Sequence, residues 1–237
     1  MLAQGKDDNL RQRLLTVGLL QELKEIYTYK ELSEILNIQE SVLCRYVNGN
    51  RIPSEKQCSN IMLKVRERIG ISQLLRNQIK IFEDGFIDVS KLLFFPNLLR
   101  SYLTLVLESK LSNNIDKVIG IASNGLPFAT FVSSIYNVPL IIAKKHKDSV
   151  FLRYLEENIK ESNSVISPIY IREDLIKKND KVLIVDDVLR TGKTFSALSN
   201  LAAKAGAKIE AAVIIASSRE NISTARTDTQ IITLFKL

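Results

Sequence analysis

The stretch KVLIVDDVLRTGKT, residues 181–194, decides the fold class and points to one site. Its four apolar residues, Val182 to Val185, have the pattern of a buried strand, and two carboxylates, Asp186 and Asp187, follow at the carboxyl end. The segment VLRTGKT then leads into a stretch with helical character, TFSALSNLAAKAG. Because ligands of open parallel sheets bind where the strands end, the stretch predicts a binding site directly after this strand.

The residues after the strand are suited to an anion. Gly192 lets the backbone close around a ligand, and the start of the following helix offers unpaired N–H groups and a favourable dipole. Hydroxyl donors and positive charges complete the set, contributed by Thr191, Thr194, Arg190 and Lys193. Two adjacent acids beside an anion site would be repulsive unless they bind sugar hydroxyls or help to hold a cation.

Apolar, β-branched runs alternate with helix-length segments from about residue 81 onward. The runs are KVIGIA, PLIIA, VISPIYI, KVLIVDD, AAVIIA and QIITLF. Apolar strands separated by helices predict an α/β fold with a mostly parallel sheet covered by helices on both faces.

The stretch 181–194 resembles, over its whole length, the 5-phosphoribosyl 1-pyrophosphate (PRPP) motif of type I phosphoribosyltransferases. The resemblance implies that Asp186 and Asp187 contact the ribose hydroxyls, that Arg190, Thr191, Gly192, Lys193 and Thr194 bind the 5′-phosphate, and that Mg²⁺ accompanies PRPP. Which residues would touch the metal stays open. A P-loop and a dinucleotide-binding loop are excluded, because neither GxxxxGK[ST] nor GxGxxG is present.

Two further segments resemble the same family. Residues 118–134, VIGIASNGLPFATFVSS, are similar to its pyrophosphate loop, which implies backbone N–H donors at Ala122, Ser123, Asn124 and Gly125. Residues 139–148, PLIIAKKHKD, are similar to the next strand and its basic tail, where Lys144 and Lys145 would face pyrophosphate. A KKHK run taken alone is usually a solvated loop, and its place at the end of a strand makes a solvated loop and a pyrophosphate site equally consistent with the sequence. A small hood over the base is expected from residues 83–96 and 228–236.

Orotate-type members of that family cover the site with a mobile, Gly-containing loop that carries Lys and His. The corresponding stretch here, about Tyr154 to Ser167, has no Gly or His and only Lys160, while Glu156, Glu157 and Glu161 would oppose pyrophosphate. We therefore expect an intact binding site under a poor catalytic lid, and we assign no catalytic residue.

The N-terminal part has a different pattern, with helical spacing and no strand-like run between Asn9 and Gln78. In residues 28–54, TYKELSEILNIQESVLCRYVNGNRIPS, Thr28 and Glu31 have the spacing of a capping box. Asn37 tolerates the left-handed turn expected between two helices. Asn48-Gly49 is expected to end the second helix, and Pro53-Ser54 to open the next.

This segment resembles the helix-turn-helix of the lambda-repressor and Cro superfamily, including the RYVNG and PS residues of its tail. In that family the second helix enters the major groove. The DNA-contacting candidates are therefore Gln39, Glu40, Ser41, Cys44 and Arg45. The alternatives are a small helical bundle used for dimerisation and a helix-turn-helix that has lost DNA binding.

The amino-acid composition argues for or against several kinds of partner and catalytic site. The 237 residues carry a net charge of +7, which suits an anionic partner without locating it. His146 is the only histidine, which argues against Ser-His-Asp and multi-histidine metal chemistry, and Cys44 and Cys58 form no CxxC pair. No apolar run approaches the length of a membrane span and no secretory signal is visible, so we expect a cytoplasmic protein without a membrane partner.

Together, the two parts resemble the archaeal GfcR-type transcriptional regulators. We expect an all-α helix-turn-helix DNA-binding domain at 1–75 and a type I phosphoribosyltransferase fold at 76–237 that binds PRPP or a related nucleotide as effector. A homodimer would bind double-stranded DNA at an inverted-repeat operator. The alternative is a catalytically active orotate or purine phosphoribosyltransferase with an appended helical domain.

Overall fold

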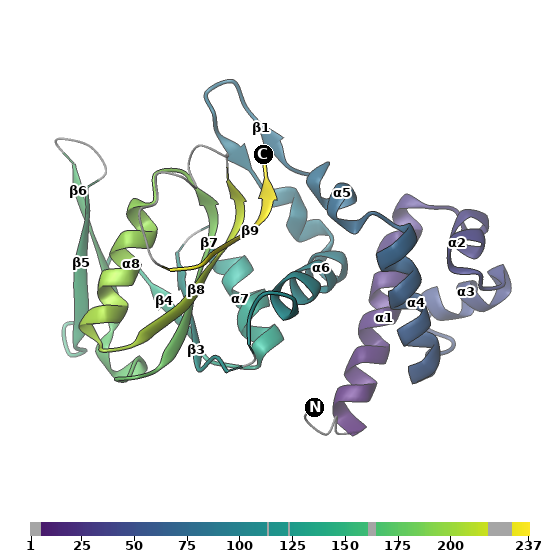
Figure 1. The fold of residues 1–237 in the computed structure, drawn as a ribbon, viewed down its shortest axis with the longest axis horizontal. Helices are drawn as coiled ribbons and strands as arrows, with labels where there is room; N and C mark the ends of the chain where they lie inside the picture. Colours follow the sequence, from purple (N-terminus) through teal and green to yellow (C-terminus); the bar gives the residue numbers. More distant parts are fainter. Residues whose placement is uncertain (1–5, 113, 123, 161–164, 218–228) are drawn as a thin grey trace. The chain divides into compact units, whose positions relative to one another are not determined.

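The computed structural model describes residues 6–112, 114–122, 124–160, 165–217 and 229–237 (Figure 1). The chain divides into two compact units, one of residues 1–80 and 90–102 and the other of residues 81–89 and 103–237. Within the described residues, no helix is long and apolar enough to cross a membrane.

The second unit is built on a five-stranded sheet in which every neighbouring pair is parallel, in the order β4-β3-β7-β8-β9. The strands are β3 (Lys117–Ile121), β4 (Leu140–Ala143), β7 (Lys181–Leu189), β8 (Lys208–Ser217) and β9 (Ile231–Lys236). Each overlaps one of the apolar runs identified in the sequence, and the expected α/β class is confirmed. The sixth run, VISPIYI, forms part of a separate hairpin.

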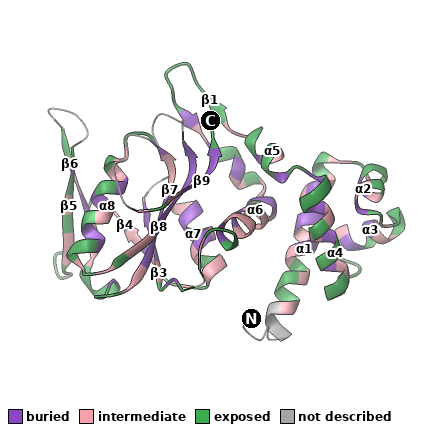
Figure 2. Cartoon of the chain, viewed as in Figure 1, coloured by how far each residue is buried: buried purple, intermediate pink, exposed green. Residues whose placement is uncertain are grey.

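Two helices cover opposite faces of this sheet. Because side chains alternate along a strand, Ile119 and Ile121 of β3 face one side, where they join a core with α8 (Lys193–Lys204). Gly120 faces the other side, where a Cβ would lie only 2.4 Å from Cβ of Ala129 in α7 (Leu126–Tyr136). The strands are consequently buried along most of their length, as Figure 2 shows.

Two small antiparallel hairpins accompany the sheet. In the first, β1 (Lys80–Ile81) is followed by β2 (Ile87–Asp88). In the second, β5 (Tyr154–Lys160) pairs with β6 (Ile166–Arg172) from Tyr154↔Arg172 to Lys160↔Ile166. In the stretch that we compared with the mobile lid of orotate-type enzymes, the described residues 154–160 and 166–167 are strand, and Ile159 and Ile169 join the core beside α8.

The first unit is helical. Its elements are α1 (Lys6–Ile26), α2 (Tyr29–Leu36), α3 (Glu40–Val47), α4 (Glu55–Arg68) and α5 (Ile71–Arg76), followed by the 3₁₀ turn Ser90–Phe94 and the start of α6 (Pro96–Glu108). A second 3₁₀ turn, Glu173–Leu175, belongs to the other unit.

The expected helix ends are present in the first unit. Thr28 and Glu31 form a reciprocal capping box at the start of α2, and Asn37 ends that helix in the left-handed region at φ +49°. Ser54 and Gln57 form a second capping box at α4. Lys64 of α4 donates from Nζ to the Leu36 carbonyl oxygen at 2.6 Å, which satisfies an acceptor at the end of α2.

Candidate active site

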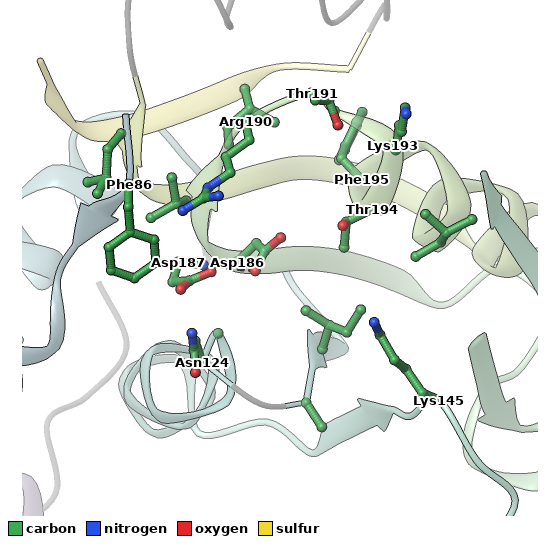
Figure 3. A pocket seen from close by; sticks show the side chains of 18 residues that line it. Phe86, Asn124, Lys145, Asp186, Asp187, Arg190, Thr191, Lys193, Thr194 and Phe195 are labelled. Atoms are coloured by element: carbon green, nitrogen blue, oxygen red, sulfur yellow. Dashed lines mark hydrogen bonds between the residues drawn. The ribbon is translucent and has the colours of Figure 1, made fainter. Parts of the chain in front are cut away.

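The carboxyl ends of β3 and β7 open into a cavity of about 640 Å³ (Figure 3). Ten of the twelve residues that we expected to bind PRPP line it, from three separate segments. They are Asn124, Gly125, Lys145, Asp186, Asp187, Arg190, Thr191, Gly192, Lys193 and Thr194. Ser123 lies outside the described residues, and Lys144 is not part of the lining.

The turn between β7 and α8 is tighter than the sequence suggested. β7 continues to Leu189 because it stays paired with β8 as far as Leu189↔Ser217. Only residues 190–192 connect it to α8, and Gly192 caps the helix at φ +71°, a conformation that glycine adopts without a steric penalty. Lys193 and Thr194 thus belong to the first turn of α8, where helix N–H groups favour an anion.

The surroundings of Asp186 disfavour the charged form of its carboxyl group. Its Oδ1 accepts a hydrogen bond from the Asp187 backbone N–H at 2.9 Å. Burial, and secondarily the charge of Asp187, raises the pKa of Asp186 well above its ordinary value. The ionised carboxylate is therefore costly in the free protein, and ligand donors or a cation would lower that cost.

The loop after β3 reaches Asp186 only because residue 125 is glycine. A Cβ at Gly125 would lie 2.8 Å from Oδ1 of Asp186 and 3.3 Å from its Cα. This approach brings Asn124 and Gly125 into the same cavity as the two acids.

The side chains of the two lysines after β4, Lys144 and Lys145, lie in different places. Lys145 lines the cavity, whereas Lys144 directs its Nζ to both carboxylate oxygens of Asp148 at 2.9 Å. This hydrogen bond from Lys144 holds the pKa of Asp148 below its ordinary value. The backbone of Lys144 is bridged to Tyr170 of β6, so successive side chains point in different directions.

The acidic residues of β5 do not act on the cavity as we expected. Glu157 forms an ion pair with Lys204 of α8 at 2.7 Å, and a hydrogen bond from Lys204 lowers the pKa of Glu157. Glu156 pairs with Lys147 at 3.2 Å. Neither glutamate lines the cavity, and Glu161 lies outside the described residues. The repulsion that we inferred from charge alone was wrong for these two residues.

Several lining residues were not identified from the sequence. The β1–β2 hairpin brings Phe86 and Ile87 to the cavity, within the first range expected for a hood. The second range was wrong for residues 231–236, which form the sheet strand β9 and do not line the cavity. Phe86 lies under the Arg190 guanidinium, 5.0 Å from the ring centroid. The other additions are apolar, namely Ile121, Ile159, Val188, Leu189 and Phe195. The aromatic FEDGF turn, residues 82–86, was the available signal for Phe86.

The expected DNA-contacting residues lie along α3 and its N-cap. Gln39, Glu40, Ser41 and Arg45 are exposed. Cys44 is partly buried, and its Sγ accepts a hydrogen bond from Asn48 Nδ2 at 3.3 Å. Its availability to a partner is therefore smaller than that of the other four.

The parallel sheet, with a cavity at the carboxyl ends of its strands, defines the class as an α/β type I phosphoribosyltransferase fold. The family model described as the phosphoribosyl transferase domain matches residues 97–237. The chain belongs to this family.

Curated relatives come from several purine-specific groups. An adenine phosphoribosyltransferase of Christiangramia forsetii is 35% identical over 130 residues, which is 52% of this chain and 70% of the relative. A hypoxanthine/guanine phosphoribosyltransferase of Methanotorris igneus is 34% identical over 147 residues, 60% of this chain and 76% of the relative. A xanthine phosphoribosyltransferase of Streptococcus uberis is 32% identical over 121 residues, 50% and 63% of the two chains.

Solved structures agree on the fold. The adenine phosphoribosyltransferase of Rhodothermus marinus superimposes with a TM-score of 0.63 at 23% identity, covering 70% of this chain and 98% of that one. The enzyme of Giardia lamblia, solved with 9-deazaadenine, has the same TM-score at 21% identity and covers 70% and 97%.

Replacing Asp186 by Asn should stabilise the unliganded protein while weakening its response to PRPP. Since the folded-state pKa is raised, ionisation costs stability at neutral pH, and each pKa unit is worth about 1.4 kcal/mol. Thermal unfolding should show the variant more stable at pH 8, with the gain shrinking as the pH falls through the raised pKa. A variant less stable than the wild type at pH 8 would contradict this account.

Replacing Gly125 by Ala should open the contact between the loop after β3 and β7. Because backbone atoms of Asp186 and Asp187 lie within 3.4 Å of the new Cβ, we expect a loss of about 1–3 kcal/mol in stability and at least a tenfold weaker PRPP affinity. Thermal unfolding and calorimetry measure the two effects. Gly70→Ala is the control, since its Cβ would meet nothing closer than Gln73 Cβ at 3.7 Å. Equal effects of both substitutions would exclude a specific close approach.

Proposed function

We propose that the chain binds PRPP with Mg²⁺ in this cavity and transfers its phosphoribosyl group to a purine base. The observation that carries the proposal is the placement of Asp186 and Asp187 beside the N-terminus of α8 in one cavity. A hydroxyl-binding acid pair next to an anion-binding helix end suits a sugar phosphate. The names of the relatives favour this transferase over the regulator that the sequence led us to place first.

The surroundings of the cavity support transfer as well as binding. Glu156 and Glu157 each form an ion pair with a lysine, which weakens the electrostatic argument against pyrophosphate for these two residues. Lys145 and Lys193 supply positive charge from opposite sides of the cavity (Figure 3). Preorganised charges of this kind stabilise a departing pyrophosphate.

The donor set fits Mg²⁺ that arrives with PRPP. The described residues contain no group of three or more His, Cys, Asp or Glu side chains that could hold a metal ion. Mg²⁺ keeps several non-protein ligands at phosphate sites, so PRPP oxygens and water would complete a shell to which the two acids contribute at most a part. When bound, the ion neutralises charge on the pyrophosphate.

The transferase is tested by pyrophosphate release from PRPP and Mg²⁺ with adenine, hypoxanthine, guanine, xanthine and orotate. We expect turnover with a purine and a loss of at least about 10²-fold in the Asp186→Asn/Asp187→Asn double variant. The Glu156→Gln variant, altered outside the cavity, is the control. Tight PRPP binding without turnover of any base would overturn the transferase and favour an effector site.

A DNA-binding regulator is the second candidate, and one observation favours it. α2 and α3 meet at the left-handed Asn37, and α3 exposes a polar surface at Gln39, Glu40, Ser41 and Arg45. In this proposal residues 1–75 bind DNA and residues 76–237 bind PRPP or a nucleotide as effector. A homodimer would then match an inverted repeat, and the effector would act through different affinities in two states.

Selection of genomic fragments by the full chain, with and without Mg-PRPP, tests this second function. We expect an enriched inverted repeat, bound about tenfold or more weakly by Arg45→Ala because a base or phosphate contact is lost. Arg66→Ala removes an exposed arginine of α4 and should have a smaller effect. No enrichment in either condition would exclude sequence-specific DNA binding.

A further inference from the structure

The Arg190 side chain lies at a different part of the cavity from Lys193 and Thr194, the other end of its motif (Figure 3). Arg190 follows β7 directly, so its backbone is fixed at the end of a paired strand. Its side chain extends away from Lys193 and Thr194, toward Phe86 and Asp187 (Figure 3). The guanidinium carbon lies 5.0 Å from the centroid of the Phe86 ring. Arg190 is therefore placed with the β1–β2 hairpin and not with the anion-binding helix end.

Phe86 and Arg190 together form a surface for a flat ring. Phe86 comes from a hairpin with an apolar neighbour, Ile87, in the same lining, and its side chain is 41% exposed. A guanidinium is planar, stacks on aromatic faces and carries five donors in a fixed plane without any acceptor. A planar ring that binds beside Phe86 would meet hydrogen-bond donors from Arg190.

The donor pattern of Arg190 distinguishes between purines. Arginine matches the O6 and N7 acceptors of guanine in a bidentate way, whereas the N6 donor and N7 acceptor of adenine suit Asn or Gln. The amide among the described lining residues is Asn124, which lies across the two acids from Arg190 (Figure 3). An adenine whose 6-amino group faced the guanidinium would leave two donors opposed, which costs about 1–3 kcal/mol.

We propose that Arg190, whose guanidinium lies over the Phe86 ring, is the specificity-determining residue of the cavity and selects a 6-oxopurine over adenine. The inference rests on the proposed transferase site, because it assumes that the base of a ribosylated ligand lies beside Phe86. It also reassigns Arg190, which the motif resemblance had placed on the 5′-phosphate.

The experiment is calorimetric binding of IMP, GMP, AMP and ribose 5-phosphate to the full chain. We expect the wild type to bind IMP and GMP about tenfold or more tightly than AMP. Arg190→Gln, which offers both a donor and an acceptor, should bring the AMP-to-IMP ratio of Kd values to about one or below. Its affinity for ribose 5-phosphate should change less than about threefold.

Two further variants separate the base from the phosphate. Lys193→Gln, at the start of α8, should weaken all four ligands by a similar factor, because it faces the shared phosphate. Phe86→Leu removes the ring and should weaken the three nucleotides but not ribose 5-phosphate. Arg190 and Phe86 are both exposed, so neither change removes core packing.

The outcomes are distinguishable. An unchanged AMP-to-IMP ratio in Arg190→Gln, or an equal loss of ribose 5-phosphate and IMP, would overturn the assignment of Arg190 to the base. A wild type that prefers AMP would point instead to the Asp187 carboxylate as an acceptor for the amino group. A wild type that binds none of the four ligands would contradict the proposed function itself.

Discussion

The site depends on the contact between Gly125 and Asp186. β3 and β7 are parallel neighbours, so their carboxyl ends lie at the same edge of the sheet. The loop after β3 can close on β7 only because residue 125 has no Cβ to occupy the space beside Asp186. Without this approach, the acids, the loop and the start of α8 would not line one cavity.

The same contact encloses Asp186, and burying its ionised carboxylate lowers the stability of the folded protein. Burial, and secondarily the charge of Asp187, raises the pKa of Asp186, so the enclosed carboxylate resists ionisation. The apolar sheet and the helices on its two faces provide the stability that permits this arrangement. A ligand with hydroxyl donors, or a cation, would recover part of that cost on binding, which couples folding stability to occupancy.

The effect of a charged side chain on the cavity depends on its ion-pair partner. The glutamates of β5 suggested a repulsive lid when counted along the sequence, yet Glu157 faces Lys204 and Glu156 faces Lys147. Lys144 is likewise committed to Asp148, while its neighbour Lys145 reaches the cavity. The sign of the electrostatic potential in the cavity depends on which of these groups face the cavity, and not on the total charge counted along the sequence.

The sequence by itself determined the features that depend on neighbouring residues. The apolar runs predicted the five strands of the sheet, and residues 186–194 predicted the short turn from β7 into α8. The Thr28 capping box and the left-handed Asn37 were visible from local spacing. Tertiary structure alone decided that Phe86 meets Arg190, that the two lysines diverge, and that β5 is an anchored strand. These contacts join segments far apart in the chain, and packing and strand pairing choose among them. Backbone hydrogen bonding and helix capping, by contrast, act over a few residues and leave a readable pattern.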